Sequence, residues 1–210
     1  MLIDVYSDVV CPWCYIGERR LQRALRERPD LAVERRWRPF QLQPGMPADG
    51  MPWAEFSRRK FGGESGARAA FERVAAAGEP DGVRFDFDRV ASAPNTVDAH
   101  RLILLSEKRG LGERVSEALF EAYFAGGADL NDHPTLIGVA AGAGLDADEA
   151  RAYLASDAGA DEVWASQQRA ADLGIAGVPF YVFDGRYAIS GAQPLETFVR
   201  TLDAARDGAG

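Results

Sequence analysis

The two cysteines of the chain stand close together, in the stretch Cys11-Pro12-Trp13-Cys14. The residues before them alternate like a β-strand, so the pair falls where a strand gives way to a helix. If Cys11 caps that helix and Pro12 fills its first position, where a missing N–H costs nothing, both cysteines share one helix face. Their Cβ atoms are then roughly 5–6 Å apart, close to the ~3.5–4.5 Å of a disulfide. This spacing predicts a dithiol that opens and closes without rebuilding the fold.

The same helix start predicts different roles for the two sulfurs. Unpaired N–H groups and the helix dipole favour negative charge there, so the Cys11 thiolate should be stabilised and act as the nucleophile. Cys14, one turn deeper, should keep its proton longer and resolve the mixed disulfide by attacking Cys11. Trp13 carries no charge, so we expect a less oxidising pair than one with histidine at that position.

Two other interpretations compete with a redox pair. A Cys-x-x-Cys can be half of a zinc site, whose remaining ligands would have to be the remote His100 and His133, the two histidines of the chain. The cysteines could also be buried and inert. Pro12 between them and the adjacent strand favour the redox pair.

The composition of the chain excludes some classes of function. With 210 residues, 47% hydrophobic and 27% charged, the chain can bury a core as a globular protein. Its net charge of -8, without a basic stripe, argues against nucleic acid and anionic membranes as partners. Residues 2–6 alternate like a strand and lack the basic n-region, apolar h-region and cleavage site of a secretory signal. No apolar run approaches ~18 residues, so we expect a cytoplasmic protein. The near-absence of lysine suggests a GC-rich bacterial genome.

Periodicity predicts the elements that position the dithiol. A strand at 2–6, a helix at 12–28 and a strand at 31–37 make a β-α-β unit with a parallel pair. Strand character returns at 180–183, followed by Asp184-Gly185, a hairpin signal, and a second apolar run. Between these ends we expect helices near 53–61, 65–78, 95–109, 112–125, 133–143, 147–155 and 158–173, with a last helix at 194–205. Asp132 and Asp146 are expected N-caps.

The fold class that follows is α/β, a thioredoxin-like fold with an inserted all-helical domain. The thioredoxin-like domain would be discontinuous, made of residues 1–43 and 175–210. The helical insertion domain would span residues 44–174.

Several segments, in order along nearly the whole chain, resemble the FrnE-like branch of the DsbA family. They are Ser7 to Gly17, Pro39-Phe40-Gln41-Leu42, Pro94-Asn95-Thr96 with Ala99-His100-Arg101, Gly177-Val178-Pro179-Phe180 and Ser190-Gly191-Ala192-Gln193-Pro194. The chain lacks the second cysteine pair that some FrnE-like proteins carry. Sister families, the kappa-class glutathione transferases and 2-hydroxychromene-2-carboxylate isomerases, have serine where this chain has Cys11, which points away from isomerisation.

The resemblance implies a role for Pro179, whose counterpart in relatives is cis and packs opposite the two cysteines. Such a bond would expose the backbone of Val178 for pairing with a bound chain, and the ring would keep a metal away from the sulfurs. The alternative is a plain turn that leads into the next strand.

The resemblance also draws attention to Asn95 and His100, which lie on one predicted helix. They could project from the insertion and hydrogen-bond a substrate. Alternatively, Asn95 caps that helix and His100 is a satisfied, partly buried side chain. A set of aromatic residues could likewise line an apolar cleft or belong to the core: Trp13, Trp53, Phe56 and Phe61.

The expected function is a cytoplasmic thiol-disulfide oxidoreductase with Cys11 as nucleophile and Cys14 as resolving thiol. It should need no metal, flavin or nucleotide, only a disulfide-containing protein or small-molecule disulfide and a cellular low-molecular-weight thiol as reductant. The oligomeric state is open, with a homodimer as one option. The alternative is a thiol-dependent small-molecule reductase or isomerase of the kappa-class transferase and chromene-carboxylate isomerase group. A chaperone or zinc-stabilised binding module is a third option.

Overall fold

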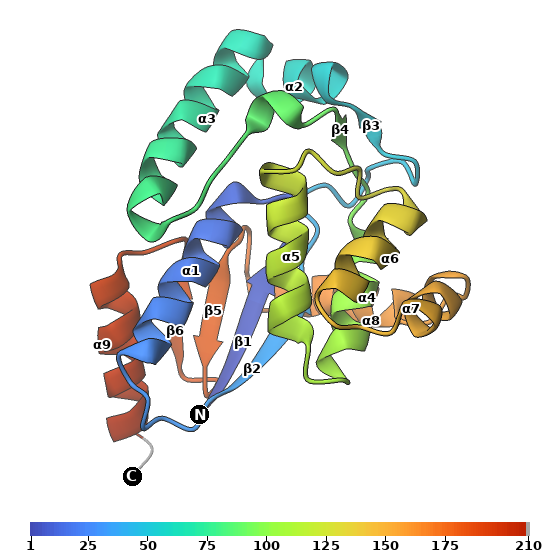
Figure 1. The fold of residues 1–210 in the computed structure, drawn as a ribbon. Helices are drawn as coiled ribbons and strands as arrows, with labels where there is room; N and C mark the ends of the chain where they lie inside the picture. Colours follow the sequence, from blue (N-terminus) through green and yellow to red (C-terminus); the bar gives the residue numbers. More distant parts are fainter. Residues whose placement is uncertain (209–210) are drawn as a thin grey trace.

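A four-stranded sheet in the order β2-β1-β5-β6 joins the two ends of the chain (Figure 1). The computed structural model describes residues 1–208. β1 (Leu2–Ser7) pairs in parallel with β2 (Glu34–Pro39) and antiparallel with β5 (Phe180–Phe183), which pairs antiparallel with β6 (Tyr187–Ser190). The parallel pair and the hairpin expected from the sequence are confirmed.

Two helices cover one face of this sheet, α1 (Pro12–Arg26) and α9 (Leu195–Asp207). Apolar residues at helical spacing face the strands from both helices, so the two layers bury one core. The core consists of Ile3, Val5, Leu21, Ala24, Tyr181, Phe183, Ile189, Phe198, Leu202 and Ala205. This core holds the second half of α1 on the sheet. The start of α1, with Cys11 and Cys14, belongs to another buried cluster, which it shares with the inserted helices.

The remaining helices lie between β2 and β5 in the sequence. They are α2 (Trp53–Phe61), α3 (Glu64–Gly78), α4 (Val97–Glu107), α5 (Gly112–Phe124), α6 (His133–Gly142), α7 (Ala147–Leu154) and α8 (Ala160–Asp172). α4 and α8 contact β2, whereas α2 and α3 form a separate layer above the start of α1 (Figure 1). Asp132 and Asp146 cap α6 and α7, accepting the N–H groups of Thr135 and Glu149 as predicted.

A buried ion pair ties α3 to α1. The Arg20 guanidinium of α1 donates to the Asp81 carboxylate at 2.6 Å, and Arg23 donates to the other oxygen of Asp81. Arg20 also donates to the carbonyls of Ala77 in α3 and Ala192 after β6. One side chain of α1 therefore contacts two segments that are remote in the sequence, residues 77–81 and the residues after β6.

The prediction of a strand at 31–37 is wrong at both ends. β2 runs from Glu34 to Pro39 because its partner β1 begins at Leu2, which pairs with Glu34. Residues 31–33 belong to no strand and follow a turn at Pro29–Asp30, where the Leu31 N–H donates to the Arg28 carbonyl. The sequence analysis also missed the short elements, because two or three residues are too few to show a hydrophobic period. These elements are β3 (Met51–Pro52), β4 (Ser92–Ala93) and the 3₁₀ turns Glu79–Asp81 and Phe87–Arg89.

The fold class is confirmed: the structure is a thioredoxin-like sheet and helix pair with inserted helices. The domain boundaries at 1–43, 44–174 and 175–210 stay a prediction, and residues 209–210 lie outside the described residues. None of the helices within residues 1–208 has the length and apolar character needed to cross a lipid bilayer.

Candidate active site

The two cysteines occupy the first turn of α1, as the sequence predicts. Cys11 is the N-cap, with extended backbone angles, and Pro12 takes the first helical position. Cys14 follows one turn later, where its N–H donates to the Cys11 carbonyl at 3.0 Å. The two residues lie 3.2 Å apart, and both are free thiols.

Their surroundings differ. Cys11 lines a cavity, whereas Cys14 lies behind it with 1% of its surface exposed. Burial raises the pKa of the Cys14 thiol well above its usual value, and the hydrogen bond and charge of Cys11 raise it further. Hydrogen bonds from the Ser7 side chain and the Asp8 backbone oppose this rise. Cys14 is therefore held as a protonated thiol beside Cys11, which is also buried, at 4% exposed, but lines the cavity.

The loop before β5 lies against Cys11. The Val178–Pro179 peptide bond is cis, and the Val178 carbonyl accepts a hydrogen bond from Cys11 Sγ at 3.6 Å. Val178 also lines the cavity. Pro179 packs on α1 at Gly17, where an added Cβ would lie 3.1 Å from the proline ring and closer still to the Tyr181 hydroxyl. Glycine at position 17 therefore lets α1 approach this loop.

The cavity beside Cys11 has a volume of about 520 Å³ and is lined mainly by apolar side chains. Trp13, Trp53, Phe56 and Phe61 all belong to its lining, which supports the cleft interpretation of these aromatics over the core interpretation. The sequence reasoning missed further lining residues, among them Met46, Phe71, Phe87, Tyr123 and Phe124. The crowding of aromatic residues between 53 and 87 was a signal that could have pointed to them.

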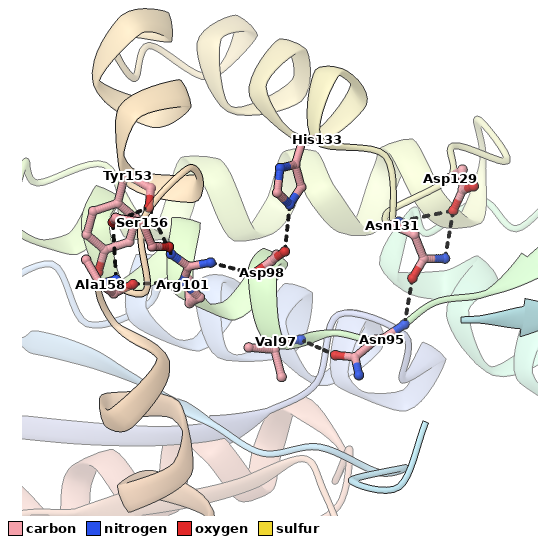
Figure 2. A network of polar contacts seen from close by, with 10 residues as sticks. All are labelled: Asn95, Val97, Asp98, Arg101, Asp129, Asn131, His133, Tyr153, Ser156 and Ala158. Carbon is pink, nitrogen blue, oxygen red and sulfur yellow. Dashed lines mark hydrogen bonds and ion pairs between the residues drawn. The ribbon is translucent and has the colours of Figure 1, made fainter. Parts of the chain in front are cut away.

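Asn95 uses its side chain within the fold. Its Nδ2 donates to the Met46 carbonyl at 2.8 Å, and its Oδ1 accepts the Val97 N–H at 3.0 Å. Its backbone N–H donates to Asn131 Oδ1, and Asn131 in turn donates to Asp129 (Figure 2). These contacts hold the start of α4, and Asn95 is absent from the described cavity lining. Contact between Asn95 and a substrate stays a prediction.

His100 is fully buried beneath the cavity wall. The indole N–H of Trp37 donates to His100 Nδ1 at 3.0 Å, and because an indole nitrogen only donates, the imidazole proton belongs on Nε2. That nitrogen lies 3.4 Å from Asp8 Oδ1, while Asp8 Oδ2 accepts the Leu42 N–H. Asp8 lines the cavity and His100 does not, so a role of His100 in binding substrate stays a prediction.

Polar contacts around α4 engage the other histidine. Arg101 donates to the carbonyls of Tyr153, Ser156 and Ala158 and to Asp98, and His133 Nε2 lies 2.7 Å from Asp98 Oδ2 (Figure 2). These contacts join α4 to α6 and to the loop before α8. Within residues 1–208, no three His, Cys, Asp or Glu side chains are grouped so that they could hold a metal ion.

A dithiol on the first turn of a helix, directly behind an inner strand of a thioredoxin-like sheet, defines the class of thioredoxin-fold disulfide oxidoreductases and isomerases. Within that class, the inserted helices are typical of DSBA-like thioredoxin domains. The chain belongs to the family of DSBA-like thioredoxin domains, whose model matches residues 2–203.

Three known proteins are similar to the chain in sequence or fold. A probable DsbA oxidoreductase from Streptomyces coelicolor is 38% identical, with a TM-score of 0.89 over 99% of this chain and 90% of that chain. The uncharacterized protein YwbO of Bacillus subtilis is 24% identical over 95% of this chain and 94% of its own. The cytosolic disulfide reductase DsbM of Pseudomonas aeruginosa, solved with GSH, has a TM-score of 0.66 at 19% identity, over 97% of this chain and 98% of that chain.

Proposed function

We propose that the chain exchanges electrons with substrate disulfides through Cys11 and Cys14. The Cys11 thiolate attacks one sulfur of the substrate disulfide, forms a mixed disulfide and releases the other half as a thiolate. Cys14 then loses its proton and attacks Cys11 Sγ, which frees the second half and leaves a Cys11–Cys14 disulfide. Two electrons pass from the dithiol to the substrate in each cycle.

The different positions of the two sulfurs relative to the cavity carry this proposal. Cys11 faces the cavity from the positive end of α1, whereas Cys14 is buried and its raised pKa keeps it protonated. A substrate therefore meets Cys11 first, and Cys14 reacts only with the sulfur already bonded to its neighbour. The Val178 backbone, which contacts Cys11, is placed to pair with the bound substrate.

We further propose the cytoplasm as the compartment and a low-molecular-weight thiol as the reductant. In the cytoplasm a dithiol is kept reduced, and its disulfide form is more often catalytic than structural. The fold likeness to a cytosolic reductase solved with GSH supports a thiol of that kind. The finer placement in the FrnE-like branch rests on the motifs around Cys11 and Pro179.

The test compares the wild type with Cys11→Ser and Cys14→Ser in a disulfide reduction assay. Cys11→Ser should lose activity, because no other sulfur reaches the substrate first. Cys14→Ser should accumulate mixed disulfides, visible by mass spectrometry of the intact protein. Circular dichroism of both variants controls for folding. Full activity in Cys11→Ser would refute the assignment.

A second candidate is a thiol-dependent small-molecule reductase or isomerase, in which Cys11 acts on a low-molecular-weight thiol adduct. The cavity of about 520 Å³ beside Cys11 favours it, since this volume suits a small molecule. Turnover of a protein disulfide, of low-molecular-weight disulfides and of quinones separates the two. If the protein disulfide does not react and the small molecules do, the second candidate replaces the first.

A further inference from the structure

The cavity beside Cys11 has an aromatic wall that is only partly buried. Five aromatic side chains line it, and each keeps part of its surface exposed. They are Trp53, Phe56 and Phe61 of α2, Phe71 of α3 and Phe87 of the 3₁₀ turn Phe87–Arg89. The rings contact one another, with centroids 3.9 Å apart for Phe71 and Phe87 and 5.3 Å for Trp53 and Phe56. Covering such surface with apolar atoms gains about 25 cal/mol per Å². The wall is therefore suited to an apolar or aromatic ligand.

The charges in the same lining favour an anion. Its charged residues are Lys60 of α2, Arg73 of α3 and Asp8. Asp8 is 1% exposed, and its Oδ2 accepts the Leu42 N–H, whereas its Oδ1 lies 3.4 Å from His100 Nε2 without a hydrogen bond. Lys60 and Arg73 are exposed, and in the described part of the chain neither forms an ion pair.

This cationic rim is unusual for the molecule as a whole, which carries a net charge of -8. An anionic small molecule would be repelled by most of the surface and attracted at this opening. Lys60 Nζ lies 5.5 Å from the centre of the Phe56 ring, so a cation and an aromatic face are presented together. Cys11, at the N-cap of α1, lines the same cavity.

We propose that the preferred substrate is a low-molecular-weight disulfide whose thiol half carries an aromatic or other apolar group and a carboxylate. This inference rests on the proposed function and names the substrate class of the same site. The apolar group packs on the wall of α2 and α3, and Lys60 and Arg73 bind the carboxylate. Cys11 attacks the disulfide, and Cys14 completes the two-electron reduction. Two molecules of a low-molecular-weight thiol then reduce the Cys11–Cys14 disulfide and become one disulfide themselves.

The charge requirement is tested with two aromatic disulfides, the dianionic 5,5′-dithiobis(2-nitrobenzoate) and the neutral 4,4′-dithiodipyridine. The preference is the kcat/KM for the anionic disulfide divided by the kcat/KM for the neutral one. The double variant Lys60→Gln/Arg73→Gln should lower this ratio by about tenfold. The matched control is Arg58→Gln/Arg68→Gln, which removes two cations from the same helices outside the cavity lining. The proposal is overturned if the double variant keeps the preference, or if the control loses it equally.

The apolar wall is tested with Phe56→Ala, which should raise KM for both aromatic disulfides about fivefold, by loss of apolar contact. Circular dichroism checks that the variant folds. An unchanged KM for both disulfides contradicts the role given to the wall.

Binding without chemistry separates this inference from the proposed function. The Cys11→Ser/Cys14→Ser protein should bind 2-naphthoate, measured by tryptophan fluorescence, and the neutral 2-naphthalenemethanol more weakly. If 2-naphthoate binds but the wild type reduces no disulfide, the proposed function fails and the anion site stands. If disulfides are reduced but 2-naphthoate does not bind, this inference fails alone.

Discussion

Ser7 is the side chain that opposes the rise in the pKa of Cys14. Its hydroxyl hydrogen-bonds Cys14 and lowers the pKa of that thiol, against the larger effect of burial. Ser7→Ala should therefore raise the pKa of Cys14 further and slow the second step of the reaction, about three- to tenfold. The measurement is the lifetime of the mixed disulfide, by quenched-flow mass spectrometry.

Ser106→Ala is the matched control for this change. Ser106 is equally buried, but its hydroxyl donates to the Ile103 carbonyl within α4, away from the sulfurs. Its loss should leave the mixed-disulfide lifetime unchanged. Equal lifetimes in the Ser7→Ala protein and the wild type would remove Ser7 from the mechanism.

At the residue scale, what could be predicted from the sequence depended on the distance between partners along the chain. Cys11, Pro12 and Cys14 are neighbours on one turn, so their spacing alone placed them. The side chains of Asn95 and His100 are instead determined by Met46 and by Trp37 and Asp8, which are remote in the sequence. No periodicity links such residues, and these contacts could not be predicted.

The approach of α1 to β5 depends on the missing side chain at Gly17. An added methyl group would meet Pro179 and Tyr181, which are both buried. Gly17→Ala should lower the free energy of unfolding by about 1–3 kcal/mol, because overpacking exceeds the gain in helix propensity. Urea denaturation measures the change.

Gly138→Ala is the control for the Gly17 prediction. Gly138 also lies within a helix, α6, but a Cβ there would meet nothing within 4 Å. Its replacement should stabilise the protein by up to about 1 kcal/mol. A Gly17→Ala protein as stable as the Gly138→Ala protein would show that α1 and β5 are not tightly packed at this point.

The contact between α4 and β2 should respond to pH. Glu107 accepts the Trp37 N–H, and burial raises its pKa from 4.5 to about 7, against the opposing charges of Arg38, Arg35 and Arg36. Between these two values the unfolded chain ionises Glu107 while the folded protein keeps the proton. Glu107 therefore lowers stability as pH rises through this window, by about 3 kcal/mol in total.

Glu107→Gln removes this charge and keeps an acceptor for the Trp37 N–H. The variant should be about 2–3 kcal/mol more stable than the wild type above pH 7, and the difference should shrink towards pH 4.5. Urea denaturation at pH 5, 6 and 8 measures it. A difference that is constant over this range would exclude the titration of Glu107 as its cause.

At the element scale, length decided which elements could be predicted. The helices of 8 to 15 residues repeat their apolar pattern often enough to be recognised, and all were expected from the sequence. The start of β2 depends on where β1 begins, which is tertiary information. The two-residue pair of β3 and β4 has no pattern of its own, although it helps to place the residues beside the cavity.

Across the whole molecule, Arg20 connects the dithiol helix to the cavity wall. The side chain of Asp81 is 4% exposed, and in an Arg20→Met variant it would pair with Arg23 alone. The carbonyls of Ala77 and Ala192 would lose the hydrogen bonds that Arg20 donates. The expected loss of stability is about 3 kcal/mol, since a buried carboxylate loses a partner. Amide hydrogen exchange should rise mainly in residues 64–82.

Arg26→Met on the exposed side of α1 is the control for this change. It should leave the exchange of residues 64–82 as in the wild type. A uniform rise in exchange over the whole chain in Arg20→Met would mean that Arg20 supports the global fold and not the position of α3.

The contact between Cys11 and Val178 spans 167 positions of the chain, and this has a consequence during synthesis on the ribosome. While the nascent chain is shorter than about 180 residues, β1 lacks its neighbour β5, and Cys11 lacks the loop that lies against it. Cys11 therefore lacks one of its neighbours for most of translation. We expect Cys11 of a nascent chain to be more open to unwanted cross-linking than Cys11 of the finished protein, until the loop at Val178 has been made.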